Sequence, residues 1–121
     1  MKLDWTDGEL AEGLRCYRAE KFFAAHEHWE LVWLHLPEPE KAFLQALIQV
    51  AAAFHHFQRA NLDGATSLLQ RAFLRLKTYP PSFGGIAVTT LCEEISGWLQ
   101  AFEARAPAPD RPFPRICLEA S

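Results

Sequence analysis

The stretch PEKAFLQALIQVAAAFHHFQRA, residues 39–60, decides the fold. Apolar side chains recur along it at helical spacing, in a row made of Phe43, Leu47, Val50, Phe54 and Phe57. A neighbouring row holds Leu44, Ile48 and Ala51. A helix that is apolar around most of its circumference is usually central and buried. We therefore predict a helix over residues 39–60 at the centre of the molecule.

Helical periodicity continues on both sides of this stretch. It predicts helices over residues 7–18 and 20–36 before it, and two after it, one from the Asn61–Gly64 turn to residue 78 and one over 89–105. Thr6 with Glu9, and Thr90 with Glu93, have the spacing of capping boxes. Prolines at positions 37, 39, 80 and 81 mark the breaks, and no segment has a convincing strand pattern.

These elements predict an all-α fold, a compact bundle of about five helices with short connections. Residues 1–105 form the predicted helical domain. Residues 106–121 form a Pro-rich extension, in which four prolines exclude a helix. Phe113, Ile116 and Leu118 favour an extended strap lying against the bundle, and a disordered tail is the alternative.

Composition narrows the class of protein without naming a reaction. The chain has 121 residues, half of them apolar, which indicates one globular domain. A net charge of −3, from 12 basic and 15 acidic residues, argues against nucleic acid or an anionic membrane as a partner. Three cysteines without a CxxC pair, and no apolar leader at the N-terminus, lead us to expect a cytoplasmic protein. The longest apolar stretch, residues 46–54, is too short to span a bilayer.

The helix over residues 20–36 carries polar side chains where apolar ones are expected. A helical wheel places His26, Glu30 and Trp33 on one face with Phe22, and directs His28 and His35 to solvent. The short connection at Pro37–Pro39 makes this helix antiparallel to the central one. Counting back from the turn then pairs Trp33 with Gln45, Glu30 with Gln49, and His26 with Ala52. We predict a polar seam between the two helices, with the central helix contributing the row Gln45, Gln49, Ala52, His56 and Arg59.

Two explanations of the seam remain open. In the structural one, Glu30 accepts hydrogen bonds from Gln49 and His26, and the network sets the helix register. In the other, His26 and Glu30, one turn apart, bind a divalent metal ion or another ligand, with Gln49, His56 or a second subunit completing the site. If the site were catalytic, Glu27 or Glu30 would be the candidate base. His55 falls on an apolar flank and is expected to pack at the boundary of the core.

Residues 22–33, FFAAHEHWELVW, resemble the signature of the bacterial and archaeal domain of unknown function 309, His-x-x-x-Glu-x-x-Trp or Tyr. His26, Glu30 and Trp33 match it position for position, and residues 43–49 and 59–65 resemble the segments that follow in that family. The resemblance extends over about residues 6–100. It implies a small all-helical fold and a motif suggested to bind metal, and it implies no established activity.

The first hypothesis is therefore a small helical protein with a metal- or ligand-binding seam at His26 and Glu30, with Trp33, Gln49, His56 and Glu27 as further candidates. The second is an interaction module, either a tetratricopeptide-like helical hairpin or a homodimer, in which the seam is purely structural. Whether the protein is an enzyme stays open.

Overall fold

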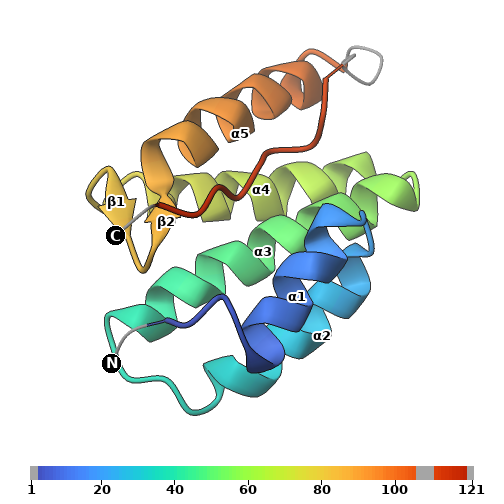
Figure 1. The fold of residues 1–121 in the computed structure, drawn as a ribbon. Helices are drawn as coiled ribbons and strands as arrows, with labels where there is room; N and C mark the ends of the chain where they lie inside the picture. Colours follow the sequence, from blue (N-terminus) through green and yellow to red (C-terminus); the bar gives the residue numbers. More distant parts are fainter. Residues whose placement is uncertain (1–2, 106–110, 120–121) are drawn as a thin grey trace.

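The computed structural model describes residues 3–105 and 111–119, in which five helices surround a single core (Figure 1). The helices are α1 (Gly8–Arg18), α2 (Phe22–Trp33), α3 (Glu40–Gln58), α4 (Leu62–Leu76) and α5 (Val88–Glu103). Two strands of two residues each, β1 (Ser82–Phe83) and β2 (Ile86–Ala87), form a hairpin between α4 and α5. The predicted all-α fold is confirmed.

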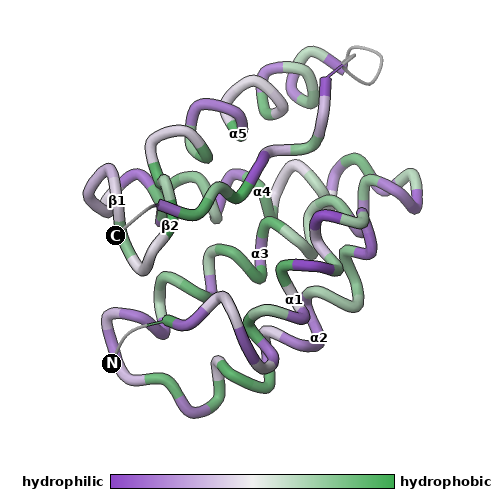
Figure 2. The backbone as a smooth tube through the Cα atoms, in the orientation of Figure 1, coloured by the Kyte–Doolittle hydropathy of each residue, from purple (hydrophilic) through white to green (hydrophobic). Residues whose placement is uncertain are grey.

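Helix α3 lies at the centre of the molecule, as its periodicity predicts. It passes between the α1–α2 pair and α4, and α5 packs on the far side of α4 (Figure 1). Hydrophobic residues recur along the whole of α3 (Figure 2). Both predicted apolar rows of α3 are buried except at Phe57, which is half-buried. In the described parts of the chain, no helix is long and apolar enough to cross a membrane.

Neither predicted capping box forms. Thr6 instead donates its backbone N–H and its hydroxyl to Asp4, and α1 begins after Asp7 without a side-chain cap. Helix α5 begins at Val88, so Thr90 lies inside the helix. The backbone N–H groups of Val88 and Thr89 both donate to the carbonyl of Pro81, so the preceding loop satisfies donors of the first turn. Helix α2 is also shorter than predicted, because residues 34–36 continue it only as a turn.

The hairpin corrects the expectation that the chain has no strands. Its two strands pair antiparallel, and the turn between them uses Gly84 and Gly85, both with positive φ (59° and 82°), a conformation that glycine adopts readily. Sequence periodicity could not reveal strands of two residues. The hairpin is stabilised from outside, because Ile86 forms an isolated antiparallel bridge with Leu118 near the C-terminus.

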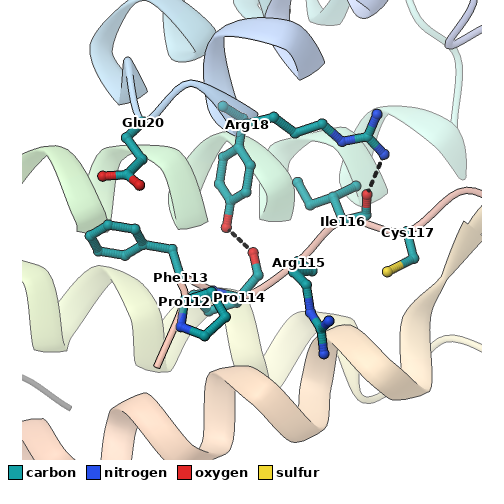
Figure 3. A pocket seen from close by; sticks show the side chains of 9 residues that line it. Arg18, Glu20, Pro112, Phe113, Pro114, Arg115, Ile116 and Cys117 are labelled. Atoms are coloured by element: carbon teal, nitrogen blue, oxygen red, sulfur yellow. Dashed lines mark hydrogen bonds between the residues drawn. The ribbon is translucent and has the colours of Figure 1, made fainter. Parts of the chain in front are cut away.

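Residues 111–119, here called the strap, run in extended conformation between α1 and α5. This confirms the predicted strap over those residues and excludes the disordered alternative there; residues 106–110 and 120–121 lie outside the described residues. Tyr17 donates its hydroxyl to the carbonyl of Pro114, and Arg18 donates to the carbonyl of Ile116 at 2.9 Å; Figure 3 shows both bonds. The strap is part of the core, because Ile116 is fully buried.

Candidate functional site

A cleft of about 420 Å³ opens over α3, between α2 and α4. Its walls come from three helices: His26, Glu30, Trp33 and Leu34 from α2, Gln45, Ile48, Gln49 and Ala52 from α3, and Leu68 and Arg71 from α4. All three residue pairs predicted from the Pro37–Pro39 turn are among them. The antiparallel register of α2 and α3 therefore brings the predicted seam together, and α4 adds a wall that the seam prediction did not include.

The side chains of His26 and Glu30 are in contact along the edge of the cleft. Nε2 of His26 lies 2.8 Å from Oε1 of Glu30, one helical turn away. The prediction that both lie within the buried stripe of α2 is wrong, because the His26 side chain is 27% exposed and that of Glu30 is 52% exposed. The buried stripe is Phe22, Ala25 and Trp29. The carboxylate therefore keeps contact with solvent and does not need a closed protein shell.

Three polar atoms of cleft residues are buried without a hydrogen-bond partner among the described residues. They are Nδ1 of His26, Nε1 of Trp33 and Oε1 of Gln49. The indole N–H is a donor and the amide oxygen is an acceptor. Nδ1 of His26 donates or accepts according to the tautomer. Each unpaired buried polar atom lowers the free energy of unfolding by about 1–3 kcal/mol. Three of them around one cleft are therefore a costly feature that needs an explanation.

Residues 10–68 match the family model described as Domain of unknown function (DUF309). The chain belongs to this family over the matched segment. The match begins in α1 and ends inside α4, so it includes every cleft residue except Arg71. It is shorter than the resemblance over residues 6–100 that the sequence suggested, and the hairpin, α5 and the strap lie outside it. No curated protein matches the chain.

The DUF309 motif residues supply a metal with too few ligands. His26 and Glu30 offer one nitrogen and one carboxylate. Over residues 3–105 and 111–119, no group of three His, Cys, Asp or Glu side chains could hold an ion together. Gln49 adds only a neutral amide oxygen, whereas protein zinc sites have three or four ligands, almost always Cys, His or carboxylate. The side chains of the described residues therefore do not fit a closed metal centre.

Two other candidates from the sequence lie away from the cleft. His56 does not line it; its Nδ1 lies 3.1 Å from Nδ2 of Asn61, where α3 ends and α4 begins. The Asn61 side chain also accepts from the N–H of Gly64 and is the true cap of α4. Glu27 is exposed on α2 and does not line the cleft. The polar row of α3 therefore contributes only its first three members to the site.

The remaining histidines divide differently from the prediction. His35 is exposed, as expected, but His28 is half-buried and bonds to Glu9 on α1, which the wheel of a single helix could not show. His55 is half-buried and packs against Phe23, with ring centroids 5.1 Å apart. Burial, helped by the nearby charges of Arg59, His56 and His26, lowers the pKa of His55.

Leu68 and Arg71 were not among the predicted site residues, because nothing local to α4 tells which of its faces borders α2. A second contact at the cleft was also missed: the ammonium of Lys41 lies 4.5 Å from the ring centroid of Trp33. This cation–π contact covers one side of the indole. The sequence does show that Leu68 and Arg71, three residues apart, share one face of a helix.

Another pocket, of about 340 Å³, lies between the end of α1 and the strap (Figure 3). Both of its arginines are already engaged, whereas the carboxylate of Glu20 has no partner among the described residues. Arg18 donates to the carbonyl of Ile116, and Arg115 forms a bidentate pair with Glu94. The α2–α3–α4 cleft is the better candidate site, because its polar atoms still lack partners.

Proposed function

We propose that this DUF309 protein binds a small polar molecule in the cleft between α2, α3 and α4. The observation that carries the proposal is the set of unpaired polar atoms of His26, Trp33 and Gln49 around that cleft. The three atoms are buried, so side-chain rotations would have to expose them to a ligand that both donates and accepts hydrogen bonds. Binding sites for small molecules commonly combine an apolar lining with a few convergent polar groups, as here.

The purely structural explanation makes a different use of the same residues. It requires Glu30 to accept from Gln49 as well as from His26. The His26–Glu30 contact is present, but no hydrogen bond from Nε2 of Gln49 to Glu30 occurs among the described residues. Oε1 of Gln49, an acceptor, is also unpaired, and Glu30 is more than half exposed. A closed register-setting network would leave no such atom. The homodimer and the tetratricopeptide-like module stay predictions that no observation here tests.

Gln49→Met tests the proposal without a known ligand. Methionine replaces the amide with an apolar group of similar size, so an unpaired oxygen is removed. We expect the free energy of unfolding to rise by up to about 1 kcal/mol, measured by urea denaturation. Gln58→Met is the matched control on the same helix, because Nε2 of Gln58 donates to the carbonyl of Glu20 at 3.1 Å. That variant should lose up to about 1 kcal/mol.

A loss of 1–3 kcal/mol in Gln49→Met, on the order expected for breaking a buried hydrogen bond, would show a closed structural network and overturn the proposal. The second test of the proposal is metal analysis of protein purified without an affinity tag. Stoichiometric zinc, manganese or iron, lost in His26→Ala, would overturn the small-molecule version and support a metal ion as the ligand. We expect no stoichiometric metal, because the ligand set is incomplete.

A further inference from the structure

The two walls of the cleft carry opposite charges. Glu30 lies on α2 and Arg71 on α4, with the glutamines of α3 between them. Arg71 is exposed and, within the described parts of the chain, has no carboxylate within 4 Å and no side-chain hydrogen bond. Glu30 contacts His26 through Oε1 and its side chain is 52% exposed, so its carboxylate can also accept from a ligand.

We propose that the ligand is a small zwitterion of the amino-acid class, with its carboxylate bound by Arg71 and its ammonium bound by Glu30. This inference rests on the proposed function and names the chemical class that the cleft takes. A guanidinium presents donors in a planar fork that matches a carboxylate. On the other wall, the negatively charged carboxylate of Glu30 favours an ammonium group of the ligand.

The charge balance of the cleft separates a zwitterion from a simple anion. One glutamate and one arginine line it, the ammonium of Lys41 lies over the ring of Trp33 at its edge, and the other polar lining residues are His26, Trp33, Gln45 and Gln49. A phosphate or dicarboxylate held by Arg71 would share the cleft with the charge of Glu30, and like charges repel. A zwitterion presents the complementary sign at each wall.

The apolar lining and the size of the cleft agree with an amino acid. Leu34, Ile48 and Leu68 lie among the polar groups and would contact the carbon side chain of the ligand. The volume of about 420 Å³ is at the lower end of the range for small-molecule sites, roughly 300–1,000 Å³. Arg71 lies beyond the segment that matches the DUF309 model, so the match does not extend to the proposed anion-binding residue.

Titration calorimetry with each standard L-amino acid and its amide tests the inference on the full chain. The amide keeps the ammonium and the side chain but lacks the carboxylate. We expect at least one amino acid to bind, and its amide to bind at least about tenfold more weakly. Arg71→Gln should reduce the affinity for the amino acid by a similar factor and leave that for the amide unchanged. Arg75→Gln, an exposed arginine one turn further along α4 and outside the cleft, should change neither.

Each failure points to a different claim. An amide that binds as well as its amino acid, or an Arg71→Gln variant with unchanged affinity, would overturn the role of Arg71. If no amino acid binds, the zwitterion class is wrong. In both cases the stability of Gln49→Met still decides the proposed function, because that measurement needs no ligand.

Discussion

At the scale of single residues, Trp29 shows how closely α1 and α2 pack. Its side chain is fully buried, and Nε1 donates to the carbonyl of Leu10 at 3.2 Å. The rings of Trp5 and Tyr17 pack against the Trp29 ring, with centroid-to-centroid distances of 6.2 and 6.1 Å. Gly13 on α1 leaves room for the indole, since a Cβ at that position would overlap the Trp29 ring. Only a residue without a side chain fits there.

Gly13→Ala is expected to destabilise the protein by about 1–3 kcal/mol, because the added methyl group forces the buried indole to move. The better helix propensity of alanine, up to about 1 kcal/mol, offsets only part of this cost. Gly97→Ala is the matched control in α5, where the added Cβ meets only the flexible end of Arg111. It should leave stability unchanged or raise it. Urea denaturation of both variants checks the difference, and equal effects would contradict it.

At the scale of elements, the strap is held to α5 by the pair Glu94–Arg115. Nη2 of Arg115 lies 2.7 Å from Oε2 of Glu94, and the backbone N–H of Arg115 donates to Oε1 at 2.8 Å. Burial by itself would raise the pKa of Glu94, but the hydrogen bonds and charge of Arg115 together lower it from its ordinary value of 4.5. The carboxylate therefore stabilises the folded state in its charged form.

This lowered pKa predicts a pH dependence. A carboxylate with a depressed folded-state pKa contributes stability that is present above its ordinary value of 4.5 and is lost as the pH falls through the folded-state pKa. Glu94→Gln should lower the free energy of unfolding by about 1 kcal/mol at neutral pH, since Arg115 is mostly exposed. The difference from the unmodified protein should shrink as the pH falls below 4.5 and vanish below the folded-state pKa. Glu93→Gln, at the exposed neighbouring position, should show no such trend; a difference that persists in acid would contradict the assignment.

At the scale of the whole molecule, Phe113 of the strap connects three helices. Its ring stacks on Trp98 of α5, with centroids 5.1 Å apart and planes within 11°. It also contacts Phe22 of α2 and Phe54 of α3, each with centroids 5.0 Å apart. Helix α5 otherwise packs on α4, and its Trp98 and Phe102 contact Phe54 and Phe57 of α3 directly. The strap therefore adds a further connection between the C-terminal helix and the helices that carry the cleft.

Phe113→Ala should lower the free energy of unfolding by about 3 kcal/mol, because the half-buried ring leaves a gap among three aromatic neighbours. Leu118→Ala is the control within the same strap, since that side chain is 42% exposed and should cost much less. Thermal unfolding of both variants is the measurement. If the two substitutions cost the same, the strap would contribute through its backbone bonds rather than through the Phe113 ring.

Much of the fold and part of the site follow from the sequence by itself. Periodicity over residues 39–60 predicted a buried central helix, and the Pro37–Pro39 turn predicted which residues of α2 and α3 meet. These features are local, because side-chain spacing within a helix and the length of a turn are set by neighbouring residues. The spacing of His26, Glu30 and Trp33 is likewise visible in the sequence alone, and these residues lie within the segment that matches the family model.

Only the tertiary structure decided the rest. The exposure of Glu30 depends on how far α2 is rotated when Trp29 packs against α1. The hairpin depends on Leu118, more than thirty residues along the chain, and the second wall of the cleft depends on α4 bringing Arg71 opposite Glu30. Such contacts join segments distant in sequence, and no periodicity along one segment encodes them. A helical wheel selects the residues on a face, and packing decides what that face meets.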